Sequence, residues 1–178
     1  MKAAPPIRVA NGAADIALAR ALFVEYAHAI GIDLCFQGFD AELASLPGKY
    51  APPEGRLFLA GPPGDACGCI ALRPLPPSAF PAAFAPPVGE VKRLYVQPRA
   101  RGTGAGRALA GAIVDAARTI GYRTLCLDTL DWMTEARALY ESLGFAPCAK
   151  YYDNPLENAV YYALRALRRC YAEPGCGS

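Results

Sequence analysis

The spacing of apolar residues along the chain predicts alternating helices and strands. Apolar positions recur every three or four residues in some stretches, as in amphipathic helices, and form short runs in others, as in strands. The helices are expected at residues 13–30, 40–46 and 104–120 and around Tyr140. The strands are expected at residues 7–10, 56–60, 67–73, 90–96, 122–129, 145–151 and 160–167. Residues 74–87 are rich in proline and lack any period, so we expect a loop there.

The most informative stretch is a strand, a turn rich in arginine and glycine, and a helix in direct succession. The turn has no side chains at Gly102, Gly104 and Gly106, so an anion can approach its backbone closely. The unpaired N–H groups and the dipole at the start of the following helix also attract negative charge. These features predict a phosphate or pyrophosphate site. Arginines add positive charge around it, namely Arg99, Arg101 and Arg107.

The glycine spacing excludes two common phosphate-binding motifs. A P-loop needs Lys and then Ser or Thr after its glycines, and a dinucleotide-binding turn needs G-x-G-x-x-G. This chain has R-x-x-G-x-G instead, at Arg101, Gly104 and Gly106. The pattern resembles the pyrophosphate loop of the GNAT superfamily of N-acyltransferases, which bind acetyl-coenzyme A. On the residues alone, a glycine-rich helix start with solvated arginines stays open as the alternative.

A second segment, at residues 136–145, resembles the A-x-x-L-Y-x-x-x-G-F signature of the same superfamily. Physically it is a helix that ends at Gly144 and leads into a strand. An apolar helix face is expected at Trp132, Ala136, Leu139 and Leu143, and Met133 and Tyr140 are expected at the edge of this face. In the family this tyrosine protonates the departing coenzyme A thiolate, so the resemblance implies that Tyr140 is a general acid. The alternative is a tyrosine that only packs.

The resemblance also implies a fold and a set of cofactor contacts. The GNAT fold is an α+β fold with a mixed sheet of about six to seven strands and about four helices. Its two central parallel strands splay apart, and the pantetheine arm enters between them. The pantetheine would pair with the backbone of Leu94, Tyr95 and Val96, and the pyrophosphate with Arg101, Gly102, Thr103, Gly104, Ala105, Gly106 and Arg107. One departure is Met133, where the family often has Asn.

Acetyl transfer from a thioester to an amine needs a neutral amine, a polarised carbonyl group and a protonated leaving thiolate. A backbone N–H near Leu94 can polarise the carbonyl group. Glu90 opens the central strand, so its carboxylate is the candidate base, acting directly or through water. An ordinary salt bridge of Glu90 with Lys92 or Arg73 is the equally weighted alternative.

The acceptor is less defined than the donor. In the family, the segment between the first two helices and the loop before the last strand shape the acceptor site, here residues 31–40 and 151–155. Their aromatic residues and few charges favour the primary amine of a small molecule. A peptide or protein amine stays open, as does an acetyl-coenzyme A-binding sensor or structural protein without turnover.

Composition narrows the class of protein further. The 178 residues suit one domain, with a core at about 7–167 and a tail at 168–178. The net charge of +2 does not favour nucleic acid as a partner, and no apolar run or leader pattern suggests a membrane or export. Seven cysteines with one histidine and no C-x-x-C pair predict no metal site and a reducing, cytoplasmic setting, with Cys170 and Cys176 in the tail. A homodimer stays open.

Overall fold

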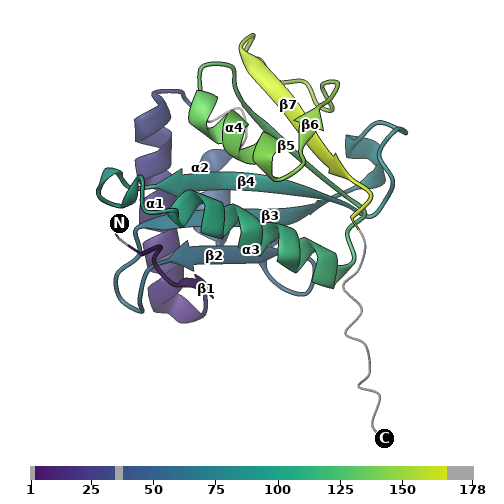
Figure 1. The fold of residues 1–178 in the computed structure, drawn as a ribbon. Coiled ribbons are helices and arrows are strands. Elements are labelled where there is room, and N and C mark those ends of the chain that lie inside the picture. The colour runs from purple at the N-terminus through teal and green to yellow at the C-terminus, as the bar shows by residue number, and fades with distance from the viewer. Residues whose placement is uncertain (1–2, 35–37, 168–178) are drawn as a thin grey trace, which may run out of the picture.

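A computed structural model describes residues 3–34 and 38–167. Their strands form one mixed sheet of seven strands in the order β1-β2-β3-β4-β5-β7-β6 (Figure 1). The strands are β1 (Ile7–Val9), β2 (Arg56–Ala60), β3 (Gly68–Leu75), β4 (Val88–Val96), β5 (Thr124–Leu130), β6 (Ala146–Pro147) and β7 (Ala159–Arg165). The pairing of β4 with β5 is parallel, and the other pairings are antiparallel. This confirms the predicted mixed sheet with a parallel central pair.

Helices cover both faces of the sheet (Figure 1). The α-helices in the described residues are α1 (Gly12–Ile30), α2 (Phe39–Ser45), α3 (Ala105–Ile120) and α4 (Thr134–Ser142). Short 3₁₀ turns lie at Gly48–Tyr50, Pro77–Ala79 and Pro98–Ala100. One core cluster joins α3 and α4 to one face, and a second joins α1 and α2 to the other. Apolar residues at helical spacing explain this packing, because they give each helix one side to bury.

The two parallel strands pair only over their first residues. The ladder between β4 and β5 stops at Glu90 and Cys126, although β4 continues to Val96. Beyond that point, a salt bridge spans the opening, with Lys92 Nζ 3.0 Å from Asp128 Oδ1. The predicted splay is therefore present, and it exposes the backbone edge of β4 on the side of β5.

A β-bulge changes the direction of side chains along β4. Lys92 lies opposite Ala71 and Tyr95 lies opposite Cys69, so β4 carries one residue more than β3 over this interval. Arg93 adopts a φ of 60° at the bulge. Val91 therefore packs on the α3 side before the bulge, as do Leu94 and Val96 after it.

The structure corrects three sequence-based boundaries. The predicted strand at 145–151 shrinks to β6, because the chain then turns inward and the hydroxyls of Tyr151 and Tyr152 reach buried carboxylates. The helix around Tyr140 begins only at Thr134, so Trp132 precedes it and is 52% exposed instead of sharing the apolar face. Finally, β3 extends into the predicted loop, because the pairing with β2 ends at Leu72 and Pro74 needs no N–H on that side.

The described cysteines are free thiols in or near the core. Cys67, Cys69 and Cys126 are buried and Cys148 is partly buried. The predicted tail with Cys170 and Cys176 lies outside the described residues. Within residues 3–34 and 38–167, no cluster of histidine, cysteine or acidic side chains is arranged to hold a metal ion. No helix in these ranges is long and apolar enough to cross a membrane.

Candidate active site

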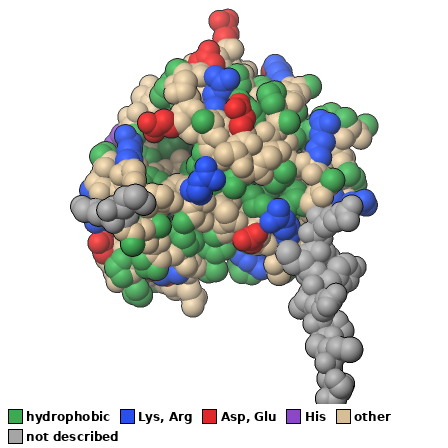
Figure 2. Space-filling model, viewed as in Figure 1, with side chains coloured by type: hydrophobic (Ala, Val, Ile, Leu, Met, Phe, Trp, Pro, Cys, Tyr) green, Lys and Arg blue, Asp and Glu red, His purple; other side chains and the backbone are tan. Residues whose placement is uncertain are grey.

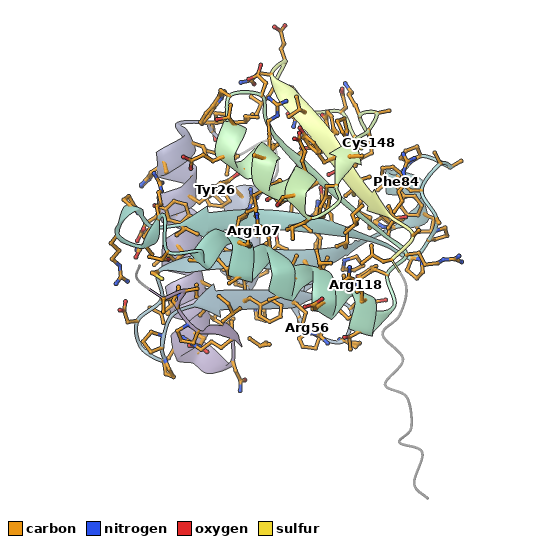
Figure 3. All side chains as sticks on the ribbon, viewed as in Figure 1. Tyr26, Arg56, Phe84, Arg107, Arg118 and Cys148 are labelled. Carbon is orange, nitrogen blue, oxygen red and sulfur yellow. The ribbon has the colours of Figure 1, made fainter. Side chains whose placement is uncertain are left out.

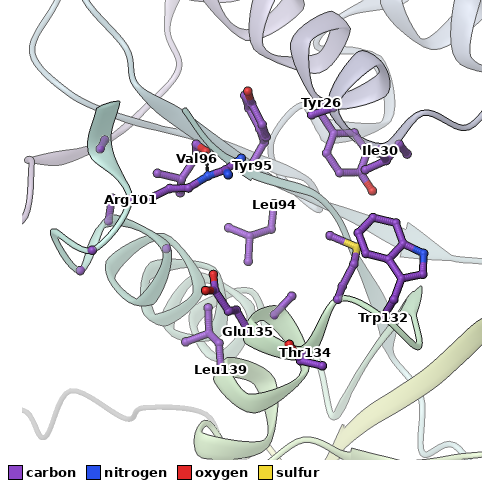
Figure 4. A pocket seen from close by; sticks show the side chains of 18 residues that line it. Tyr26, Ile30, Leu94, Tyr95, Val96, Arg101, Trp132, Thr134, Glu135 and Leu139 are labelled. Carbon is purple, nitrogen blue, oxygen red and sulfur yellow. Dashed lines mark hydrogen bonds between the residues drawn. The ribbon is translucent and has the colours of Figure 1, made fainter. Parts of the chain in front are cut away.

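A cleft of about 640 Å³ opens where α1, β4, α4 and the start of α3 meet. Figure 2 shows the surface hollowed between these elements. The close view places Tyr26, Ile30 and Trp132 at one end of the cleft and Arg101 at the other, with Leu94 between them (Figure 4). This volume lies within the range of pockets that hold small molecules and cofactors.

The Arg101 end of the cleft has the geometry of an anion site. Gly102 and Gly104 adopt φ values of 74° and 87°, in the left-handed region that favours glycine. The backbone N–H groups of residues 105–107, in the first turn of α3, find no acceptor among the described residues. Arg101 Nε donates to the carbonyl oxygen of Val96 at 3.2 Å, which holds its guanidinium over the cleft. Together these groups can bind a pyrophosphate.

Most of the predicted cofactor contacts lie on this cleft. They are Leu94, Tyr95, Val96, Arg101, Gly102, Gly104, Ala105 and Gly106. Two predicted contacts do not line it. The Thr103 hydroxyl donates to the carbonyl oxygen of Ala100 at 2.7 Å and so stabilises the turn. Arg107 reaches from α3 to α4, where Nη2 donates to Ser142 Oγ at 3.0 Å (Figure 3).

Arg99 also lies away from the lining of the cleft, although the sequence places it beside the glycine turn. Its guanidinium forms an exposed salt bridge with Asp65, with Nη2 2.5 Å from Oδ1. Of the three arginines that the sequence suggests for the anion, Arg101 is therefore the one whose side chain lines the cleft.

The cleft continues into a small cavity of about 50 Å³ inside the gap between β4 and β5. The two spaces share Tyr26, Leu94, Met133 and Ala136 as lining residues. The lining of the gap otherwise comes from Val91, Lys92, Arg93, Asp128, Thr129 and Tyr140. A ligand that lies along the edge of β4 therefore points its end into a polar gap in the sheet.

Tyr140 stands in this gap with its hydroxyl available. Its side chain is only 6% exposed, and its ring packs edge-on against Phe145. The hydroxyl forms no hydrogen bond within the described part of the chain, yet every fully shielded polar side-chain atom there has a partner. The hydroxyl must therefore face the open space of the gap. Burial raises the pKa of Tyr140, so the hydroxyl keeps its proton at neutral pH.

A buried ion pair closes the gap opposite Tyr140. Burial by itself would raise the pKa of Asp128, but the charge and hydrogen bond of Lys92 outweigh it and lower this pKa. Burial would lower the pKa of Lys92, yet the charges of Glu90 and Asp128 raise it. The Tyr152 hydroxyl donates to Asp128 Oδ2 at 2.8 Å. Both charged groups thus keep their charge at neutral pH.

Glu90 lies behind this pair and lines neither the cleft nor the gap. It is 1% exposed. Arg73 Nε donates to Oε2 at 2.6 Å, and the Tyr151 hydroxyl donates to Oε1 at 2.9 Å. Lys92 Nζ lies 3.6 Å from Oε1. The structure therefore contains both salt bridges that the sequence suggested as the alternative to a catalytic base.

Comparison with known proteins decides the family. The model of the acetyltransferase (GNAT) family matches residues 25–145, which include the cleft, the glycine turn and Tyr140. The chain belongs to the GNAT family. It is 40% identical over 144 residues to an uncharacterised N-acetyltransferase of Schizosaccharomyces pombe, a match that covers 80% of this chain and 83% of the relative.

Further relatives and solved structures agree with this GNAT assignment. An aminoglycoside N(6')-acetyltransferase of Stenotrophomonas maltophilia is 33% identical over 121 residues, covering 66% of this chain and 78% of the relative. The fold matches that of an acetyltransferase from Streptococcus agalactiae, with a TM-score of 0.70, 18% identity and coverage of 90% and 97%. It also matches yncA of Salmonella typhimurium, solved with acetyl-CoA, with a TM-score of 0.61, 20% identity and coverage of 97% and 98%.

Several residues of this GNAT site do not stand out in the sequence. Tyr26 reads as part of the apolar stripe of α1, and Trp132 as part of the face of α4. Lys92 and Asp128 lie on separate strands, so only the splay brings them together. A polar residue inside an otherwise apolar strand, as at Asp128, is the one signal that could have pointed to the gap.

Proposed function

We propose that this GNAT protein transfers an acetyl group from acetyl-coenzyme A to a primary amine of a small molecule, directly within a ternary complex. The observation that carries the proposal is the continuity of the cleft with the strand gap. One end of this continuous space suits a pyrophosphate, and the other holds a free tyrosine hydroxyl. A donor that spans both ends would bring its thioester to Tyr140.

The residues of the cleft fit acetyl-coenzyme A. The first turn of α3 and the turn at Gly102 and Gly104 would hold the pyrophosphate through backbone N–H groups. The splayed edge of β4 at residues 94–96 would pair with the pantetheine amides. Met133 lines the cleft and would pack against this arm instead of forming the hydrogen bonds of an amide side chain. That yncA carries acetyl-CoA in the same fold supports this placement.

The chemical roles follow from the position of each group. Tyr140 donates its proton to the departing sulfur, because its hydroxyl is protonated, unpaired and inside the gap. The backbone N–H of Leu94 polarises the carbonyl oxygen. The amine proton passes to water in the gap. Glu90 orders this region by fixing Lys92 and Tyr151, since its carboxylate is fully engaged and lines neither space.

A small acceptor is supported by the aromatic cluster on the far side of the gap. Tyr151, Tyr152 and Tyr161 pack with ring centroids 5.4–6.0 Å apart, and Tyr152 contacts Asp128. Rings of this kind, with few free charges, suit a compact amine better than an extended chain. The names of two relatives, an IAA acetyltransferase of Azospirillum brasilense and the aminoglycoside enzyme, also refer to small molecules.

Two measurements test the proposal. Trp132 is the sole tryptophan and lines the cleft, so its fluorescence should change on titration with coenzyme A but not with ATP or NAD. Thiol release from acetyl-coenzyme A should then rise with a small primary amine in a panel of amines, amino acids and peptides. Turnover with peptides alone would refute the small-molecule acceptor. Absence of both the fluorescence change and the turnover would refute the acetyltransferase itself.

A further inference from the structure

Tyr26 of α1 stands at the junction of the cleft and the gap and lines both (Figure 4). Its ring packs edge-on against the Tyr95 ring, with centroids 6.3 Å apart. The guanidinium of Arg93 lies over the Tyr26 ring, 6.0 Å from the ring centroid. Residues of the β4 bulge therefore fix the ring, so its hydroxyl is held in place before any ligand arrives.

The Tyr26 hydroxyl lacks a hydrogen-bond partner within residues 3–34 and 38–167. A shielded hydroxyl without a partner is unfavourable, so most are paired in native proteins. Because no fully shielded polar atom in these ranges is unpaired, this hydroxyl also faces the open space. A hydroxyl donor that is fixed beside the cleft and the gap is suited to bind an acceptor atom of the ligand.

The charges around Tyr26 favour an acceptor that gains negative charge. Burial raises the pKa of Tyr26, while the nearby charges of Arg93 and Lys92 act to lower it. The one nearby anion of the gap, Asp128, is already paired with Lys92 at 3.0 Å. The surroundings of the hydroxyl are therefore more favourable to an oxyanion than to an ammonium group.

We infer that Tyr26 donates a hydrogen bond to the carbonyl oxygen of the thioester and stabilises the negative charge that develops there during acetyl transfer. The inference rests on the proposed function. The amine nitrogen forms the C–N bond, and an electron pair of the C=O bond moves onto oxygen. When that pair returns, the C–S bond breaks and sulfur takes the proton of Tyr140. The amine proton leaves to water, which reprotonates Tyr140.

Position separates Tyr26 from the other candidates for this role. Tyr140 comes from α4, across the gap from α1, and is assigned to the sulfur. Tyr152 already donates to Asp128, so its hydroxyl is engaged. Tyr26 is the tyrosine that lines both spaces, and the thioester would lie where these spaces meet.

The test is Tyr26→Phe, which keeps the ring and removes the hydroxyl. Infrared difference spectra of acetyl-coenzyme A labelled with ¹³C at the carbonyl carbon, bound to the protein, report directly on hydrogen bonds to that oxygen. We expect the carbonyl band to lie at higher frequency in Tyr26→Phe than in the unmodified protein. Affinity for acetyl-coenzyme A, measured by Trp132 fluorescence, should change little. The control is Tyr122→Phe, whose hydroxyl donates to the Glu54 carbonyl oxygen instead.

Kinetics with the best amine of the panel provide the second readout. Loss of one oxyanion donor costs about 10²–10³-fold in turnover, so we expect kcat to fall by about 10²-fold while the backbone donor remains. An unchanged carbonyl band, or a raised acceptor KM with kcat retained, would overturn the inference. If no amine is acetylated by the unmodified protein, the proposed function fails, but the carbonyl band still decides the contact of Tyr26.

Discussion

Replacing Glu90 by Gln tests whether the Glu90 carboxylate has a structural or a catalytic role. The side chain is 1% exposed and its oxygens contact Arg73, Tyr151 and Lys92 at 2.6–3.6 Å. Glutamine keeps the shape but removes the charge that neutralises the buried Lys92 and the partly buried Arg73. Removing one partner of a buried ion pair costs about 3–5 kcal/mol. For a chain of this length, 1 kcal/mol corresponds to about 2–4 °C in Tm, so we expect Tm to fall by roughly 6–20 °C.

The assay is thermal unfolding of Glu90→Gln beside Asp65→Asn. The second variant removes a carboxylate from the exposed pair with Arg99, in which both side chains are more than half exposed. Surface pairs contribute little to stability, so its Tm should match that of the unmodified protein. Thiol release across pH, below the melting temperature of both variants, then shows whether the pH dependence of turnover changes.

The reasoning would be refuted by a Glu90→Gln protein with an unchanged Tm and a lost acidic limb in its pH–rate profile, because a base is inactivated when it is protonated. That result would make Glu90 the base that removes the amine proton. A destabilised protein whose pH–rate profile keeps its shape supports the structural role that its buried contacts indicate.

Three further expectations concern the cleft, the gap and its ion pair. Gly104→Val forces a β-branched residue into a φ of 87°, so coenzyme A affinity by Trp132 fluorescence should fall, whereas Gly111→Ala on the open side of α3 should leave it unchanged. Tyr140→Phe should cut turnover by about 10²–10⁴-fold with Tm and coenzyme A affinity nearly unchanged. Full turnover in this variant would mean that Tyr140 only packs. Because the folded pKa of Asp128 is lowered, its stabilisation is complete above about pH 4 and is lost as pH falls through the folded pKa. Denaturant unfolding should therefore show the stability gap to Asp128→Asn narrowing below that pH, and a constant gap would contradict this.

Local signals in the sequence account for the elements of the fold and for the donor end of the site. The glycines at 102 and 104 do adopt the left-handed backbone that their turn requires. The helix around Tyr140 ends at Ser142, and Gly144 two residues later adopts the left-handed backbone expected after a helix end, with the N–H of Phe145 donating to the carbonyl oxygen of Tyr140. These features depend on residues close together in the chain, so a pattern of neighbours is enough to predict them.

The polar side of the gap depends on contacts between distant residues and was not predictable. Tyr151 meets Glu90 across 61 positions, and Lys92 meets Asp128 across 36. Periodicity placed Tyr26 in an apolar stripe, because it cannot tell a core position from one that faces a cavity. Contacts between distant residues also explain why β6 is shorter than predicted. The hydrogen bond of the Tyr152 hydroxyl with Asp128 outweighs the local preference of this segment for an extended strand.

The additional residue in β4 changes which side chains of the strand face α3. Before Arg93, odd-numbered side chains face α3, and after it even-numbered ones do, as at Val91 and Leu94. Deleting one residue there would restore a uniform alternation and leave the downstream side chains on their present sides, because β4 would then match β3 residue for residue. Loss of the bulge with all residues kept would instead exchange those sides, so Leu94 would point to α1 and Tyr95 to α3. The additional residue thus determines which side chains of β4 after Arg93 pack on the α3 side and which face α1.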